Sequence, residues 1–87
     1  MPEGRETRLK RLYMRSIRRG IKEMDVILGR FAKARLAGLD PDSLDDYDAM
    51  LSENDHDLYQ WVTGQTAPPE RFKAIVARIS AEVEPAK

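Results

Sequence analysis

The stretch Gly38-Leu39-Asp40-Pro41-Asp42-Ser43-Leu44 marks the end of one helix and the start of another. Its first residue is a glycine, which is typical of the position just after a helix. Asp40 is a preferred N-cap residue, and Pro41 fits the first helical position because its missing N–H is not needed there. Leu39 and Leu44 predict a hydrophobic staple across this cap. So short a link predicts two helices that pack as neighbours.

Apolar residues recur at helical spacing on both sides of this stretch, and strand patterns are nearly absent. Before it, we expect a helix over residues 21–37 and a basic helix that Thr7 caps and Gly20 ends or bends. After it, we expect a helix that starts at Pro41 and continues to Leu51, a short helix from Asn54 to near Gly64, and a last helix. The last helix buries Phe72, Ile75, Val76, Ile79 and Val83.

The fold class that follows is all-α, a compact bundle of about five short helices. Trp61 is the expected central anchor, because it is the largest apolar side chain and its helix is too short to be stable alone. We expect a flexible N-terminal tail over residues 1–6, one helical domain over residues 7–83, and a frayed C-terminal tail over residues 84–87.

Size and composition exclude several classes of protein. A chain of 87 residues predicts one domain with a small core and no room for an enclosed catalytic cavity. Without cysteine there is no disulfide framework and no thiolate metal site, and His56 is the only histidine. No apolar run suits a membrane span or a secretory signal. We therefore expect a cytoplasmic, monomeric protein without a metal or a membrane contact.

The charges are segregated although the net charge is zero. Basic residues dominate from Arg5 to Arg35, and from Asp40 to Asp57 every charged residue is acidic, the histidine aside. Such asymmetry favours protein partners. The basic first helix leaves open an alternative, an antitoxin-like or nucleic-acid-binding regulator, although a nucleic-acid binder more often carries a net positive charge.

The candidate functional stretch is Arg19-Gly20-Ile21-Lys22-Glu23, flanked by Arg18 and Asp25. One interpretation is helix punctuation, in which a glycine is followed by acids in the first turn of the next helix. The other is a recognition surface on which Arg19 and Glu23, four residues apart, project together toward a carboxylate, a phosphate or a main chain. The aspartates between residues 40 and 48 do not have the spacing of a calcium loop and suit helix caps and a solvated face. No nucleophile, base and orienting group stand together, and there is no phosphate loop.

Three motifs resemble those of the succinate dehydrogenase flavinylation factors. The residues Arg19-Gly20-Ile21-Lys22-Glu23-Met24-Asp25 resemble the Arg-Gly-x-x-Glu motif of that family. The segment Leu28 to Phe31 looks like its bacterial members. Asp57-Leu58-Tyr59-Gln60-Trp61-Val62, followed by Gly64, looks like the family's acidic-Leu-aromatic-x-Trp-Leu segment, with Val62 where leucine is commoner. The resemblance extends from about Arg8 to Ile79.

The resemblance implies a five-helix bundle that acts as an assembly factor and is not itself an enzyme. Members bind the flavoprotein subunit of succinate dehydrogenase, and often that of fumarate reductase, and promote covalent attachment of FAD to it. They hold no stably bound cofactor, so the FAD acted on is the partner's. Carried over to this sequence, Arg19 and Glu23 form the partner-binding surface, Gly20 is the turn, and Arg18 and Asp25 support it.

Overall fold

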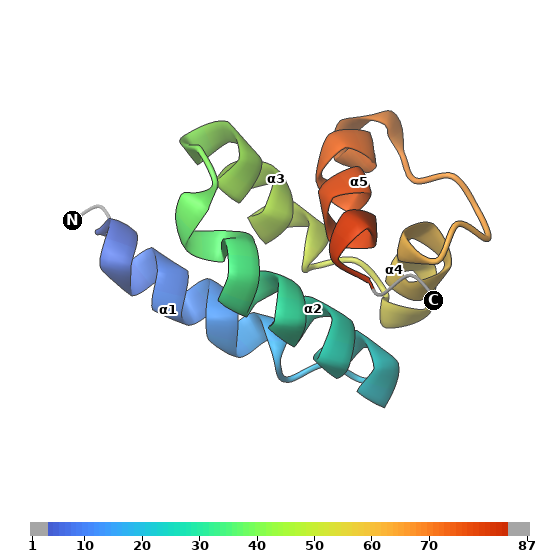
Figure 1. The fold of residues 1–87 in the computed structure, drawn as a ribbon, viewed down its shortest axis with the longest axis horizontal. Coiled ribbons are helices and arrows are strands. Elements are labelled where there is room, and N and C mark those ends of the chain that lie inside the picture. Colours follow the sequence, from blue (N-terminus) through green and yellow to red (C-terminus); the bar gives the residue numbers. More distant parts are fainter. Residues whose placement is uncertain (1–3, 84–87) are drawn as a thin grey trace.

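A computed structural model describes residues 4–83 of the chain (Figure 1). Within that range it contains helices only, so the expected all-α bundle of about five short helices is confirmed. The elements, in chain order, are α1 (Arg5–Ser16), α2 (Lys22–Arg35), the 3-10 turn η1 (Leu36–Gly38), α3 (Pro41–Met50), α4 (Asp55–Val62), the 3-10 turn η2 (Glu70–Phe72) and α5 (Lys73–Glu82). The expected tails at residues 1–3 and 84–87 lie outside the described residues.

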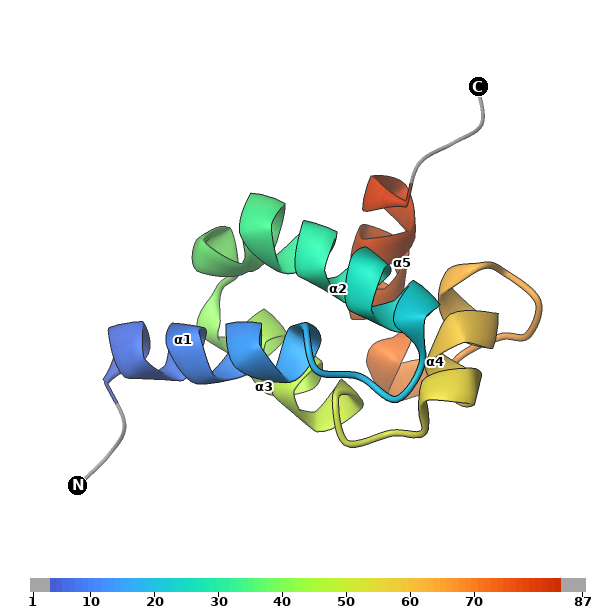
Figure 2. The same ribbon diagram turned by 90° about the horizontal axis from the view of Figure 1, so that it is seen from below.

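The helices α1 and α2 run side by side in opposite directions, with α3 against α1 and α5 crossing α2 (Figures 1 and 2). The helix α4 lies beside the start of α2 (Figure 2). Every helix is too short to be stable alone, so its stability depends on burying one apolar face against these neighbours.

The largest buried side chains are Tyr47 and Phe31, whose ring centroids lie 5.5 Å apart at the centre of the core. Around them are apolar side chains from every helix: Leu12, Met24, Leu28, Met50, Leu58, Ile75 and Ile79. Tyr47 can be fully buried because its hydroxyl is 2.6 Å from the buried hydroxyl of Ser16. A buried polar group with a partner avoids the cost of desolvation without compensation.

The expectation that Trp61 is the central anchor is wrong. Trp61 is half-buried at the edge of the core, where its ring lies 6.1 Å from that of Phe72. Its indole N–H has no hydrogen-bond partner among residues 4–83, unlike the hydroxyl of Tyr47, so it lies where water can reach it.

The predicted starts of α3 and α4 match the structure, whereas both predicted ends of the first helix do not. Asp40 precedes Pro41 at the start of α3, and Asn54 caps α4 by accepting the N–H of His56 at 2.8 Å. The first helix begins at Arg5 with Gly4 as N-cap, so Thr7 is not its cap, and Arg5 and Glu6 are helical. The side chain of Arg5 fixes this turn by donating to the carbonyl oxygens of Ala37 and Leu39, both at 2.9 Å.

The second wrong boundary is the end of the first helix. The helix α1 ends at Ser16, four residues before Gly20, and α2 starts at Lys22 and gives way to η1 after Arg35. The N–H groups of Arg19 and Gly20 bind carboxylates in place of helical carbonyls, so the intervening residues 17–21 form a loop. This loop holds the first half of the candidate site.

Candidate partner-binding site

Two side-chain carboxylates bind the main chain of the loop between α1 and α2. Asp25, in the first turn of α2, accepts the N–H of Arg19 through Oδ1. Asp55, the first residue of α4, accepts the N–H of Gly20 through Oδ2 at 2.6 Å. The loop is therefore tied to two helices by charge-assisted hydrogen bonds, which are stronger than neutral ones.

The side chain of Arg19 points into the protein. Its Nε lies 2.7 Å from Oδ1 of Asp55, and only 9% of the side chain is exposed. One terminal nitrogen donates to the carbonyl oxygen of Arg15 in the last turn of α1, at 3.3 Å. The other reaches the carbonyl oxygen of Glu53, between α3 and α4, at 3.5 Å. Arg19 therefore joins the end of α1, the linker before α4 and the start of α4.

The feature that favours glycine at position 20 is the close approach of the Asp55 carboxylate to the main chain, and not an unusual backbone angle. The φ of Gly20 is not positive; among the described residues only Gly64 has a positive φ, of 83°. A Cβ atom on Gly20 would lie 2.9 Å from Oδ2 of Asp55, a distance that real Cβ contacts essentially never show. Any side chain there would push the carboxylate away from the main chain that it binds.

Glu23 and Arg18 lie on the surface, and the side chain of neither has a hydrogen bond or ion pair with another residue in the range 4–83. The prediction that Arg19 and Glu23 project together does not match this geometry, because Arg19 lies in the loop and only Glu23 lies on α2. Four-residue spacing brings side chains together only inside one helix. The motif thus contains one buried side chain, that of Arg19, and two exposed residues, Gly20 and Glu23.

Sequence reasoning missed Asp55 as a part of this site. Its position after Asn54 indicated only a helix start, which is also correct. Its contacts with Arg19 and Gly20 span 36 and 35 residues, so no local pattern contains them. The available signal was the excess of acids between residues 40 and 57 opposite the basic N-terminal third.

The basic first helix is largely neutralised inside the protein. The carboxylate of Asp48 in α3 forms ion pairs with Arg15 at 2.6 Å, Arg11 at 3.1 Å and Arg8 at 3.3 Å. Arg8 also forms an ion pair with Asp45 at 2.8 Å. Burial disfavours the charged form of Asp48, but these arginines outweigh it and hold the pKa of its carboxyl below the ordinary value. The charge segregation seen in the sequence therefore serves the contact of α1 with α3.

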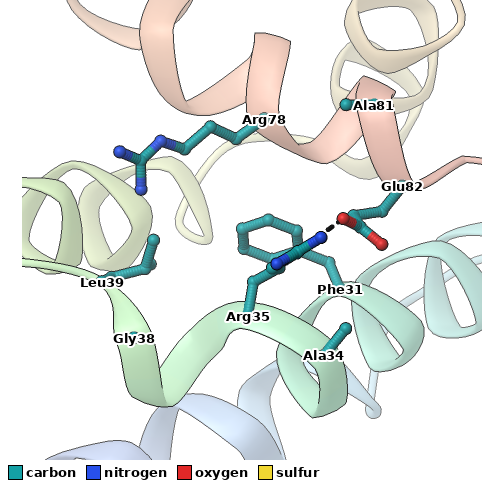
Figure 3. A pocket seen from close by; sticks show the side chains of 8 residues that line it. All are labelled: Phe31, Ala34, Arg35, Gly38, Leu39, Arg78, Ala81 and Glu82. Atoms are coloured by element: carbon teal, nitrogen blue, oxygen red, sulfur yellow. Dashed lines mark hydrogen bonds and ion pairs between the residues drawn. The ribbon is translucent and has the colours of Figure 1, made fainter.

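A separate hollow of about 430 Å³ lies between the C-terminal half of α2 and α5 (Figure 3). Arg35 spans it and binds Glu82 at 2.7 Å, over a floor that includes Phe31. Arg78 lines the same hollow, and its charge lowers the pKa of the nearby Asp40, whose largest influence is a hydrogen bond with Ser43. One of the two arginines, Arg35, is thus already paired with an acid across the hollow. The hollow contains none of the predicted site residues.

Metal-binding clusters and membrane-spanning helices are both absent from residues 4–83. No three histidine, aspartate or glutamate side chains gather there as metal ligands would. None of the helices in this range is long and apolar enough to cross a membrane.

Fold and site together define a small all-α protein in which the loop between α1 and α2 is fixed by carboxylates and is followed by an exposed acid. The family described as "Flavinator of succinate dehydrogenase" matches residues 10–83. The chain belongs to this family, as the motifs had indicated. The basic-helix alternative, a nucleic-acid-binding or antitoxin-like regulator, receives no support from this match.

Three relatives carry the name "Succinate dehydrogenase assembly factor 2, mitochondrial". The one from Meyerozyma guilliermondii is 46% identical over 74 residues, which are 82% of this chain and 55% of the relative. The one from Candida glabrata is 43% identical and that from Debaryomyces hansenii 40%, each over 82% of this chain and, respectively, 48% and 52% of the relative. The chain spans about half the length of the curated relatives it matches.

These names contradict the cytoplasmic location expected from the sequence, since all three relatives are called mitochondrial. The expectation rested on the lack of cysteine and of an apolar leader. Neither feature separates the cytoplasm from another reducing compartment, so composition could not support that choice.

Proposed function

We propose that this chain binds the flavoprotein subunit of succinate dehydrogenase and promotes covalent attachment of FAD to it. The family match over residues 10–83 is the observation that carries the proposal. The proposal extends to the flavoprotein of fumarate reductase as a second client. The chain acts as a monomer and does not hold the cofactor itself.

The proposed docking surface surrounds the loop between α1 and α2. Glu23, Arg18 and Gly20 are exposed there, and the side chains of Arg19 and Asp25 fix the loop from inside. The two exposed large apolar side chains of the described range also flank this loop. They are Met14, 40% exposed and lining one hollow with Arg18, and Val26, 52% exposed and three residues after Glu23 on α2.

The proposed action is positioning, without a catalytic residue on this chain. For attachment, the 8α methyl group of the flavin loses a proton and a histidine nitrogen of the partner bonds to that carbon. The electron pair of the broken C–H bond stays on the ring system, so the attached flavin is reduced by two electrons, and an external two-electron acceptor such as dioxygen or a quinone then reoxidises it. The partner supplies both reacting groups. A bound protein that holds them in the reactive geometry lowers the barrier by several kcal/mol. In this proposal Glu23 pairs with a cationic or N–H group of the immature partner.

The test is covalent flavin fluorescence of the flavoprotein subunit after denaturing electrophoresis. The purified apo subunit is incubated with FAD, alone and with this chain over a range of concentrations. We expect the chain to raise the fluorescence and Glu23→Ala to lower that stimulation about tenfold or more, because it removes a charged contact. Its thermal midpoint should stay within about 2 °C of the wild type, since the exposed Glu23 side chain has no hydrogen bond or ion pair with a described residue.

Asp42→Ala is the matched control. Asp42 is exposed and holds the second position of α3, as Glu23 holds the second position of α2. We expect this variant to stimulate like the wild type. Equal stimulation by folded Glu23→Ala would remove Glu23 from the docking surface, and no stimulation by the wild type would refute the function.

A further inference from the structure

Asp55 is a residue outside the Arg-Gly-x-x-Glu motif that binds two of its members at once. Its Oδ1 lies 2.7 Å from the Nε of Arg19, and its Oδ2 lies 2.6 Å from the main-chain nitrogen of Gly20. Its side chain is 15% exposed. One carboxylate therefore fixes the side chain of one residue and the main chain of the next.

The anchor for this contact is rigid. Asp55 is the first residue of α4, where a negative charge is favoured by the helix dipole, and Asn54 caps the same turn. The helix α4 packs against both α2 and α5, with Leu58 and Val62 in the core. A contact to Asp55 therefore ties the loop to the body of the bundle.

We propose that Asp55 is a positioning residue, which fixes the loop between α1 and α2 in the conformation that presents Glu23 and Arg18 to the partner. We call Asp55 together with Arg19 and Gly20 the Asp55 clamp. The inference rests on the proposed function for its consequence, but not for its geometry. It also gives the reason for the glycine of the motif, because a Cβ atom at that position would lie only 2.9 Å from Oδ2 of Asp55.

The first test replaces Asp55 with asparagine, which has nearly the same shape but different hydrogen-bonding atoms. Asp55→Asn keeps the size of the side chain, but one of its two head atoms is now an NH₂ donor. Both atoms of Asp55 face N–H donors, so asparagine must break one of the two contacts. We expect half-maximal flavin attachment to require a concentration of Asp55→Asn about tenfold higher than that of the wild type, with the maximal level unchanged. The docking surface is intact in this variant, but a smaller fraction of the molecules holds the loop in the binding conformation.

Asp57→Asn is the control for charge and helix position. Asp57 is exposed in the same first turn of α4, and its side chain has no hydrogen bond with another residue in the described range. It should show the concentration dependence of the wild type.

The second test is spectroscopic and does not depend on the partner. The Gly20 amide should show a strongly shifted proton resonance and slow hydrogen exchange in the wild type, because its N–H binds a carboxylate. In Asp55→Asn both properties should be lost, while core resonances such as those of Leu28 and Ile79 stay in place. A residue that only stabilised the fold would leave the Gly20 amide unchanged under conditions where the variant is folded.

The third test is a double-mutant cycle. Gly20→Ala should weaken partner binding strongly in the wild type and much less in Asp55→Ala, where the oxygen that the methyl group meets is absent. Additive effects of the two substitutions on partner binding would contradict the Asp55 clamp.

Two other results would also contradict the inference. An unchanged Gly20 amide resonance in Asp55→Asn would show that the Asp55 clamp does not exist. Stimulation by Asp55→Asn with the concentration dependence of the wild type would contradict the positioning role. Absence of wild-type stimulation would instead refute the proposed function, while the resonance test would still decide whether the clamp exists.

Discussion

At the scale of single residues, two glycines are needed for different physical reasons. Gly20 leaves space for Asp55, whose Oδ2 would lie only 2.9 Å from a Cβ atom at this position. Gly64 is needed for its backbone angle, because its φ of 83° lies in the left-handed region. There it ends α4 in a Schellman motif, in which Gln65 N–H binds the carbonyl of Gln60 at 2.8 Å and Gly64 N–H binds that of Trp61 at 3.2 Å.

Gly64→Ala should therefore destabilise the protein although a Cβ there would meet no atom within 4 Å. The expected loss is about 1–2 kcal/mol of unfolding free energy, the cost of a left-handed conformation for a residue with a side chain. Urea denaturation followed by circular dichroism measures it.

Gly38→Ala provides the comparison. Gly38 also has open space around it, but its φ is not positive. Alanine should be neutral there or stabilising by up to about 1 kcal/mol, because it restricts the unfolded chain. Equal losses for both variants would show that backbone angle is not what makes Gly64 necessary.

At the scale of elements, the contact of α1 with α3 is the one built on charge. Asp48 accepts three arginines of α1 and its side chain is only 26% exposed, whereas Asp45 pairs with Arg8 alone and is 60% exposed. The partly buried acid carries more of the contact, because solvent screens the exposed pair.

Asp48→Asn should lower the unfolding free energy by about 1–3 kcal/mol, since it leaves the arginines without their common acceptor. Asp45→Asn should cost about 0–1 kcal/mol. Thermal unfolding at low and high salt measures both. Asp48 has a lowered pKa in the folded state, so its contribution is present at neutral pH and is lost as the pH falls below about 4. Equal stability of the two variants at pH 7 would contradict this assignment.

At the scale of the whole molecule, a buried polar contact joins α1 to α3 at the centre of the core. The hydroxyl of Ser16 donates to the carbonyl of Leu12 at 2.7 Å, so the hydroxyl of Tyr47 is the donor in their 2.6 Å contact. Burial raises the pKa of Tyr47 to about 12, although the charges of Arg19 and Arg15 work in the opposite direction.

This raised pKa predicts alkaline unfolding. Above pH 10 the unfolded chain releases the Tyr47 proton while the folded chain keeps it, so stability falls as the pH rises from about 10 to about 12. One group contributes at most about 1.4 kcal/mol per pH unit. Tyr47→Phe should lower the unfolding free energy by about 1 kcal/mol near neutral pH, because the hydrogen bond is lost. In this variant the unfolding free energy should also fall less steeply above pH 10, because the Tyr47 hydroxyl is absent. Urea denaturation from pH 8 to pH 11.5 measures the unfolding free energy of both proteins. The same dependence of this free energy on pH in the wild type and in Tyr47→Phe would refute the argument.

Much of the fold could be predicted because helix signals are local. The caps at Asp40 and Asn54 and the stop near Gly64 each act within one turn. The bounds failed where distant groups intervened. Arg5 extends α1 backward by reaching the carbonyls at residues 37 and 39, and carboxylates of α2 and α4 take the N–H groups that would have extended it forward.

By itself, the sequence determined the all-α class, most helix positions and the motif that indicates the family, because periodicity, caps and motifs are written in neighbouring residues. Only the tertiary structure decided that Tyr47 and not Trp61 lies at the centre, and that Arg19 turns inward while Glu23 stays outside. It alone brought Asp55 to Gly20. Such contacts depend on which side chain 35 residues away arrives at hydrogen-bond distance, and packing of the whole bundle settles that.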